Sequence, residues 1–274
     1  MVVVKNTVFV NLSSQNGGAV FLDSEEDLKI YFVICISCSA AAQGGGVYAK
    51  CNSLFIKSSC FEQCFSQIGH AFYHIGGANY STNCSQITTT YCYSIGYGTQ
   101  GRSIDSISKI FASKNVNSSY NTSPHIMCIR TNFSPQTSIS YSIFTNCYTT
   151  TKDDIGVLLQ FQTNGNSVID HLIIKDNNCS SVSGYGVLRS YQCSVDATNL
   201  TLINNTAPCL YTGTMYLKDC YTSGNSAVEG SIQNKLSNPV YFDLGLMVCF
   251  QSKPRNRPAK VSTSLLFVYV IISK

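Results

Sequence analysis

The stretch Tyr31-Phe-Val-Ile-Cys35-Ile-Ser-Cys38, followed after Ala40-Ala-Ala-Gln by Gly44-Gly-Gly-Val-Tyr48, decides the fold of this chain. A short β-branched strand leads into a Cys-containing corner, a small-residue turn with glycine, and a second short apolar strand. Each strand alternates inward apolar residues with outward polar ones, so a single coil cannot bury its own inner face. Neighbouring coils must therefore stack to complete a core.

The same order of features recurs along the chain, as a repeat in pattern rather than in letters. Equivalent glycines are separated by about twenty to thirty residues, which indicates one coil per unit. The sequence therefore predicts an all-β fold, a right-handed parallel β-helix (solenoid) over residues 1–250, with a short C-terminal apolar segment. The further units are Thr7–Leu22, Ser53–Tyr73, Ile139–Gln160, Ile169–Leu188, Leu200–Tyr211 and Met215–Val228.

The bends of the predicted coils hold Gly-Gly and Asn-Asn pairs. Glycine permits positive φ and close backbone approach, and asparagine tolerates the same left-handed conformation. Asn or Cys at equivalent corners of successive coils could form side-chain ladders. The stretch from about 82 to 135 fits worst, because turn formers outnumber core formers in runs such as Asn115–Pro124. We expect irregular coils and a long loop there.

Composition supports a folded β protein. The chain has 274 residues, of which 44% are hydrophobic and 12% charged, and it contains no tryptophan. This content is too hydrophobic for a disordered chain and suits strands and turns. The formal net charge of +4 is mild, and the dense basic run Lys253–Lys260 falls in a predicted linker, residues 251–260. A nucleic-acid partner is not expected, because such proteins carry a basic face over a folded surface.

The cysteines do not follow the spacing of a small disulfide scaffold. They number fourteen and are scattered at irregular intervals, and a chain of this length needs no staples. We expect many of them to be buried thiols, because a free cysteine packs as a small hydrophobe.

Both ends of the chain stop inside apolar segments. Met1–Val8 lacks the pattern of a signal peptide and resembles a strand entered midway. Residues 261–274 form an apolar tail that is shorter than the roughly 20 residues of a spanning helix. The tail is either a truncated membrane anchor or a last buried strand, and we expect the chain to be a fragment or a truncated family member.

Nine Asn-x-Ser/Thr sequons are possible glycan acceptors if the chain enters a secretory pathway. Against this, a chain rich in Asn, Ser and Thr also generates such triplets by chance. We expect the sequons that are used to point outward. They begin at Asn11, Asn79, Asn83, Asn117, Asn121, Asn132, Asn178, Asn199 and Asn204.

The repeat units resemble the glycine-rich, right-handed β-helix repeats of polymorphic outer-membrane-type proteins and of the related large surface proteins of trichomonad parasites. Three features carry the resemblance: Asn16-Gly-Gly-Ala-Val-Phe21, Gln43-Gly-Gly-Gly-Val-Tyr48, and the Asn-Asn turns at Asn177 and Asn204. The likeness covers about two thirds of the chain. It implies an exposed ectodomain, often with one C-terminal transmembrane anchor. The sequence as given is expected to depart from that pattern, because neither a leader nor a full-length anchor can be recognised in its residues.

An enzyme has to be considered, because many parallel β-helices are polysaccharide lyases or hydrolases. Glycoside hydrolysis needs two carboxylates at a defined separation. Asp153 and Asp154 are adjacent and would point to opposite faces if they lie in a strand, and Glu25-Glu26-Asp27 is typical of a solvated turn. The best local cluster is Asp170-His171 with Asp176, in which His171 could act as a general base. A surface or strand histidine is the simpler interpretation.

Metal and nucleotide sites are not favoured either. Cys35 and Cys38 have a zinc-like spacing and Cys60 and Cys64 lie nearby, but the first pair sits in an apolar β-branched run. Buried thiols or an inter-coil disulfide are the default interpretation of these residues. His70 and His74 alternate with apolar residues like strand positions. Gly44-Gly-Gly lacks the Lys-Ser/Thr of a phosphate loop.

The sequence therefore predicts a surface-exposed, non-enzymatic ectodomain with a structural or adhesive role, on the cell surface or outside the cell. We assign no catalytic residues, metal ligands or cofactor. Expected partners are a glycan or a host-surface protein, and a membrane through the C-terminal segment. A carbohydrate-active enzyme is the alternative, and a cluster of acidic side chains on one outer face would identify it. The aromatic residues, mostly Tyr, either cap the core or line a sugar-binding face.

Overall fold

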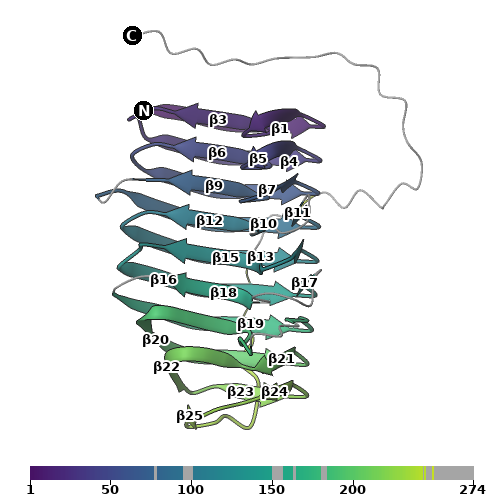
Figure 1. Ribbon diagram of the computed structural model, residues 1–274, viewed down its shortest axis with the longest axis vertical. Helices are drawn as coiled ribbons and strands as arrows, with labels where there is room; N and C mark the ends of the chain where they lie inside the picture. Colours follow the sequence, from purple (N-terminus) through teal and green to yellow (C-terminus); the bar gives the residue numbers. More distant parts are fainter. Residues whose placement is uncertain are drawn as a thin grey trace, which may run out of the picture.

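The computed structural model describes residues 1–76, 79–94, 101–149, 157–162, 165–179, 184–242, 244 and 249. Strands wind into a stack of parallel coils, so the predicted β-helix is confirmed (Figure 1). Each regular coil contributes a long bent strand, a short strand at a corner and a third strand. The predicted basic linker (251–260), the apolar tail (261–274) and the residues Asp153 and Asp154 lie outside the described residues.

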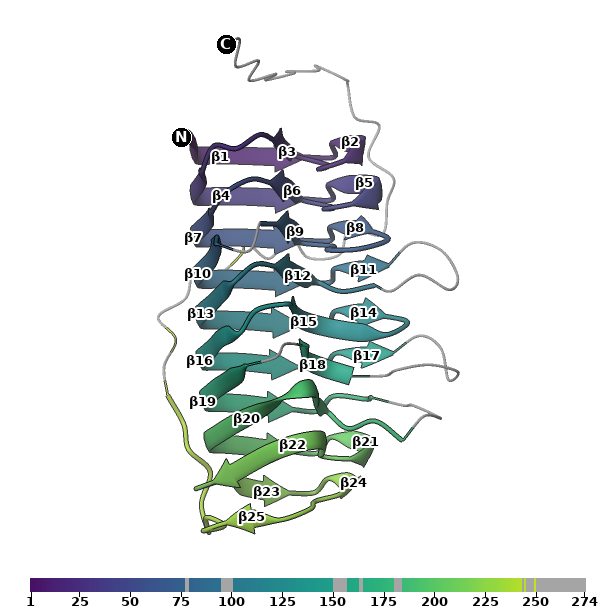
Figure 2. The same cartoon turned by 60° about the vertical axis from the view of Figure 1, so that its left-hand side comes forward.

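The three strands of each coil pair in parallel with their counterparts in the next coil (Figure 2). The long first strands are β1 (Val2–Val10), β4 (Leu28–Ile36), β7 (Leu54–Glu62), β10 (Ser81–Thr90), β13 (Ile110–Ser119), β16 (Gln136–Thr145) and β19 (Asn166–Lys175). The short second strands are β2 (Ser13–Asn16), β5 (Ser39–Gln43), β8 (Phe65–Ser66), β11 (Tyr93–Ser94), β14 (Thr122–Ser123) and β17 (Tyr148–Thr149). The third strands are β3 (Val20–Asp23), β6 (Val47–Lys50), β9 (Phe72–Ile75), β12 (Ile104–Ile107), β15 (Ile126–Asn132) and β18 (Val157–Gln162).

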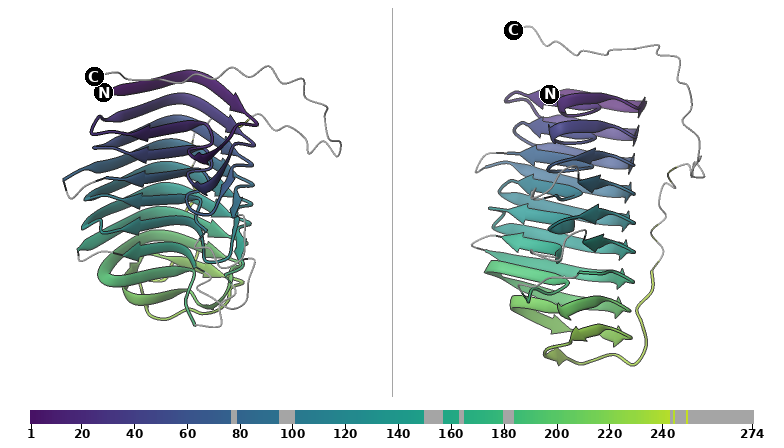
Figure 3. Two further views of the ribbon diagram at one scale, coloured as in Figure 1. Left: turned by 45° about the horizontal axis from the view of Figure 1, so that its top comes forward. Right: turned by 45° about the vertical axis from the view of Figure 1, so that its right-hand side comes forward.

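The coils become simpler toward the C-terminal end of the stack. One long strand, β20 (Leu188–Ile203), pairs first with β18 and then with β19, so it joins the third strand of one coil to the first strand of the next. The last strands are β21 (Thr206–Cys209), β22 (Tyr211–Lys218), β23 (Tyr221–Ser223), β24 (Ser226–Val228) and β25 (Ile232–Gln233). The right-hand view of Figure 3 shows how these coils close the lower end.

The alternation of inward and outward side chains in each first strand determines which residues form the core. In β4, Leu28, Ile30, Val33 and Cys35 are fully buried and point inward, and the alternation changes phase at Phe32. Phe32 has a φ of 53°, and this left-handed residue bends the strand. The same register position is left-handed in all seven first strands, in β20 and directly after β22. These residues are Asn6, Phe32, Ser58, Gln86, Asn115, Tyr141, His171, Asn199 and Asp219.

The described part of the stretch from 82 to 135 is more regular than the irregular coils we expected. β10 pairs with β7 and β13 through its length, and one register shift occurs, between Ile126 and Ile129 of β15. The run from Asn115 belongs to β13, where Asn115 takes the left-handed position and Asn117 faces outward. Outward and corner positions accept polar residues, so a low hydrophobic content did not break the coil.

After β25 the chain turns back along the outside of the stack (Figure 2). Leu236 N–H donates to the carbonyl of Cys220 at 2.8 Å. Val240 N–H donates to Thr201 Oγ1 at 2.9 Å, and Thr201 Oγ1 lies 3.1 Å from the Val240 carbonyl. Phe242 packs edge-on against Tyr141, with ring centroids 5.8 Å apart.

Candidate functional site

One corner of the stack is held by a ladder of inward side chains, which we call the Cys/Asn ladder. It lies between the first and second strands, one residue per coil, and its cysteine and asparagine members are buried or half-buried. The predicted side-chain ladder of Asn and Cys is confirmed. Its members are Cys38, Cys64, Cys92, Asn121, Cys147, Asn177, Asn205 and Asn225.

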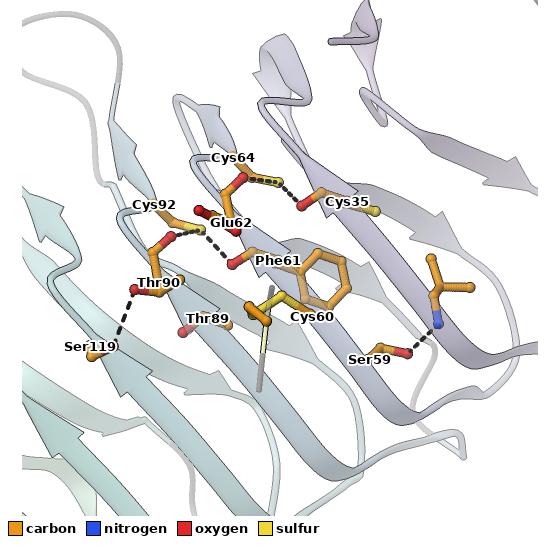
Figure 4. The surroundings of a disulfide bond; sticks show 12 residues. Cys35, Ser59, Cys60, Phe61, Glu62, Cys64, Thr89, Thr90, Cys92 and Ser119 are labelled. Atoms are coloured by element: carbon orange, nitrogen blue, oxygen red, sulfur yellow. Dashed lines mark hydrogen bonds between the residues drawn. A yellow bond between two sulfur atoms is a disulfide. The ribbon is translucent and has the colours of Figure 1, made fainter. Parts of the chain in front are cut away.

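Thiols and amides in this ladder donate hydrogen bonds to equivalent backbone carbonyls of the preceding coil. The Cys64 thiol donates to the carbonyl of Cys35 in the preceding coil at 3.6 Å, and the Cys92 thiol donates to that of Phe61 at 3.5 Å (Figure 4). Asn177 Nδ2 donates to the equivalent carbonyl of Phe144 at 3.0 Å. Asparagine adds an acceptor, since Asn121 Oδ1 receives the backbone N–H of Cys92 at 2.8 Å. Each member therefore fixes the corner of its coil to the coil before it.

The residues on either side of each ladder member point outward and form the walls of a hollow. We call this hollow the tyrosine groove, and its volume is about 500 Å³. The wall before the ladder position consists of Ser37, Gln63, Tyr91 and Tyr120, and the wall after it of Phe65, Tyr93, Thr122 and Tyr148.

Rings of neighbouring coils stack along both walls. Tyr91 and Tyr120 have centroids 5.0 Å apart with planes 12° from parallel, and Phe65 and Tyr93 have centroids 5.1 Å apart with planes 17° from parallel. Tyr91, Tyr93, Tyr120 and Tyr148 nevertheless keep 40 to 50% of their surface exposed. Contiguous exposed apolar patches mark interaction sites or ligand-binding grooves.

The chemistry of the groove is neutral and amphipathic. None of the described residues that line it carries a charge. Its polar groups are the phenol hydroxyls, the Thr122 hydroxyl and the side chains of Ser37 and Gln63, where Ser37 Oγ donates to Gln63 Oε1 at 3.1 Å. Flat apolar rings with hydroxyl groups at their edges suit a ligand that has both C–H faces and hydroxyl edges. The structure thus places these tyrosines outside the core, whereas Phe61, Phe72, Phe111, Phe144 and Phe161 fill it.

A second hollow of about 430 Å³ lies where β20 and β22 pass from one coil to the next. Its lining includes Gly165, Asn166, Ser190, Gln192 and Gly213, with no aromatic or charged side chain among the described residues. It offers small polar groups and few surfaces for stacking. The tyrosine groove is therefore the better candidate for a binding site.

The sequence cluster of Asp170, His171 and Asp176 is only partly assembled. His171 Nδ1 lies 2.7 Å from Asp170 Oδ2, while the other carboxylate oxygen accepts from Thr198 at 2.7 Å and Asn199 at 2.9 Å. Burial alone would raise the pKa of Asp170, but the hydrogen bonds from Thr198, Asn199 and His171 outweigh it and lower this pKa. Asp176 lies at the next corner and accepts from Asn204 at 3.1 Å, so it does not join the pair.

Asp105, Glu25 and Glu26 do not join this pair either. Asp105 is fully buried and forms ion pairs with Arg102 at 2.9 Å and Arg130 at 3.0 Å. Glu25 and Glu26 are exposed, in agreement with the predicted solvated turn. The three carboxylates of Asp105, Asp170 and Asp176 thus lie in separate environments.

The cysteines with zinc-like spacing have structural roles. Cys38 and Cys64 belong to the Cys/Asn ladder, and Cys35 points into the core. No group of three or more potential metal ligands occurs among the described residues. His74 Nδ1 lies 2.6 Å from Thr82 Oγ1 and Nε2 lies 3.3 Å from the Cys51 carbonyl, whereas neither ring nitrogen of the buried His70 has a hydrogen-bond partner. Ten of the twelve free cysteines are buried, as expected, and burial raises the pKa of Cys51 to about 12.

Sequence reasoning missed a disulfide between Cys60 and Cys249. Cys60 is buried on the outer side of β7, beside the inward ring of Phe61 (Figure 4). The bond joins residues 189 positions apart, so it ties the returning C-terminal segment to the N-terminal half of the stack.

Two of the nine sequon asparagines are buried. Asn121 is fully buried because it is a ladder member, and Asn132 is 8% exposed. The other seven sequon asparagines are exposed or half-buried. The register of the coil, which the sequon pattern ignores, decides which asparagines are accessible.

Comparisons with protein-family models, curated proteins and solved structures find no match to this chain. Among the described residues, no helix has the length and apolar character needed to cross a membrane.

Proposed function

We propose that this chain is a non-enzymatic, surface-exposed β-helix ectodomain with an adhesive role, and that the tyrosine groove binds a neutral glycan. The observation that carries the proposal is the exposure of four tyrosine rings around one uncharged hollow. Aromatic rings contact the C–H faces of sugars, and the phenol and amide groups can bond to sugar hydroxyls. The rigid coils hold these rings in fixed positions, so little conformational freedom is lost on binding.

Three further features support a location at the cell surface or outside the cell. The Cys60–Cys249 disulfide is typical of proteins in oxidising compartments. Most sequon asparagines are accessible to a glycosylating enzyme. The Gly-Gly corners resemble the repeats of polymorphic outer-membrane-type and trichomonad surface proteins, and in such proteins a C-terminal segment like residues 261–274 would supply a membrane anchor. A host-surface glycoprotein would present the same neutral sugars as a free glycan.

The test is binding of the purified chain to an array of neutral and acidic glycans. Tyr91→Ala and Tyr120→Ala should each weaken binding about tenfold, which corresponds to about 1.4 kcal/mol. Tyr216→Ala is the matched control, because Tyr216 is 62% exposed but lies outside the groove. Equal losses in all three variants, or binding restricted to acidic glycans, would contradict the proposal.

A carbohydrate-active enzyme is the second candidate, and the Asp170–His171 hydrogen bond favours it. The pair has the geometry of a base and its orienting carboxylate. A reducing-sugar assay on the glycans that bind separates the two functions. Sugar release that Asp170→Asn abolishes would assign an enzyme, whereas binding without release supports the adhesive role.

A further inference from the structure

One wall of the tyrosine groove contains an interruption in its stack of rings. Phe65, Tyr93, Thr122 and Tyr148 occupy the same register position in successive coils. Phe65 and Tyr93 stack at 5.1 Å, but the next position holds the small side chain of Thr122. The following ring, Tyr148, therefore lies two coils beyond Tyr93.

The width of this interruption matches the thickness of one sugar ring. Neighbouring strands lie about 4.8 Å apart, so Tyr93 and Tyr148 are separated by roughly 9.6 Å along the stack. A flat ring in contact on both faces at about 3.5–4.0 Å needs about 7–8 Å, and a puckered ring needs somewhat more. The space above Thr122 is thus wider than a flat ring requires and close to what a pyranose chair requires.

We infer that Tyr93, Thr122 and Tyr148 form a subsite, the Thr122 slot, that receives one pyranose ring of a neutral glycan between the two tyrosines. This inference rests on the proposed glycan-binding function and names the residue that determines its specificity. Thr122 is half-buried and lines the hollow together with Tyr120, whose ring stacks on Tyr91. The slot therefore opens into the rest of the groove, and a longer glycan can extend from it over the Tyr91–Tyr120 stack.

The surroundings of the slot favour a sugar over a nucleotide. Single-stranded nucleic acids bind where aromatic rings alternate with basic side chains that contact the phosphates. The described lining of the groove has no Lys or Arg. A neutral sugar needs only ring faces and hydroxyl partners, and both are present.

The variant Thr122→Phe tests the slot by filling it. Phe already occupies this register position at Phe65, where it stacks on Tyr93, so a ring at 122 should continue the stack toward Tyr148. Thr122→Ala is the matched control, because it keeps the slot open. The probes are β-1,4-linked hexasaccharides of glucose and of N-acetylglucosamine and an α-linked mannose hexasaccharide, titrated by calorimetry.

Thr122→Phe should weaken binding of the probe that the wild-type chain prefers at least tenfold. Thr122→Ala should weaken it less, because it removes one hydroxyl but keeps the slot open, and Tyr216→Ala, outside the groove, should leave it unchanged. Circular dichroism establishes that both variants keep the β-fold. If Thr122→Phe does not fold, Tyr148→Leu replaces it, since losing one wall should weaken binding to a similar degree. Unchanged affinity in the folded variant would overturn the slot and leave the groove intact. No binding of any probe by the wild-type chain would overturn the slot and the proposed function together.

Discussion

Asn177 in one coil accepts a hydrogen bond through Oδ1 from the backbone N–H of Cys147 in the coil before it, at 2.9 Å. Asn177 Nδ2 donates to the carbonyl of Phe144 at 3.0 Å and to Asn205 Oδ1 at 3.0 Å. One side chain thus satisfies buried groups in both neighbouring coils, and it lies beneath the corner that carries the tyrosine groove.

Asn177→Ala should lower the free energy of unfolding by about 2–4 kcal/mol, because it leaves buried backbone groups without partners. Asn177→Cys should cost less, since a thiol donates to the equivalent carbonyl elsewhere in the ladder. Ser138→Ala, at an exposed position of β16, is the control and should change stability by less than about 0.5 kcal/mol. Urea titrations followed by circular dichroism measure all three. Equal effects of Asn177→Ala and Ser138→Ala would show that the ladder does not hold the coils.

The ladder was predictable because its residues are chemically distinctive. Cys38, Cys64 and Cys92 follow strands of similar length, and a short polar or thiol side chain at this position can reach the backbone of the preceding coil. The glycine corners were predictable for the same reason, as at Gly45, where backbone leaves no space for a side chain. The left-handed residues Tyr91 and Tyr120 were not predictable, because large side chains rarely adopt positive φ and the stacked coil imposes it on them.

The tyrosine groove could have been found from the ladder, since residues before and after an inward position must point outward. In the triplet Tyr91-Cys92-Tyr93 the inward cysteine places both rings on the surface. The ring that stacks on each tyrosine, however, depends on the register between successive coils, and the irregular repeat does not give this register. The Cys60–Cys249 disulfide depends on the path of the chain after β25, and strand periodicity holds no information about that path.

Reduction of the Cys60–Cys249 disulfide with a dithiol, or the variant Cys249→Ser, should release the C-terminal segment without unfolding the coils. β7 keeps its backbone pairing with β4 and β10 whether or not the disulfide is present. Loss of a bond across so long a loop should cost about 2–5 kcal/mol. We expect faster proteolysis after residue 233 with an unchanged β spectrum. Cys209→Ser, at a half-buried free thiol, is the control, and equal protease sensitivity of both variants would contradict the prediction.

Acid should destabilise the chain through its buried histidines. Burial, with Arg102 nearby, lowers the pKa of His70 to about 3, and burial lowers the pKa of His74 to about 4. An unfolded histidine titrates near 6.5, so below that pH the unfolded state binds protons that the folded state does not. Stability should therefore fall as the pH drops from 6.5 toward 4, by up to about 1.4 kcal/mol per pH unit for each histidine.

His70→Met tests this acid effect, because it removes one titrating group that has no hydrogen-bond partner to lose. The variant should show a shallower loss of urea stability between pH 6.5 and 4 than the wild-type chain. His74 is less suitable, since its contacts with Thr82 and Cys51 would be lost as well. An identical slope in His70→Met would mean that His70 is already protonated in the folded chain.

Two glycines separate the effect of space from the effect of backbone conformation. A Cβ at Gly45 would lie 2.3 Å from the carbonyl oxygen of His70 and 2.7 Å from that of Phe65, so neighbouring coils cannot approach normally. Gly184 has a φ of +74° but nothing within 4 Å of its added Cβ. Gly45→Ala should therefore disrupt the pairing between coils and lower the thermal midpoint strongly. Gly184→Ala should cost about 1–2 kcal/mol, the ordinary cost of a left-handed residue with a side chain. Calorimetric scans that rank the two variants in the opposite order would show that backbone strain, and not the close contact of coils, limits substitution at these corners.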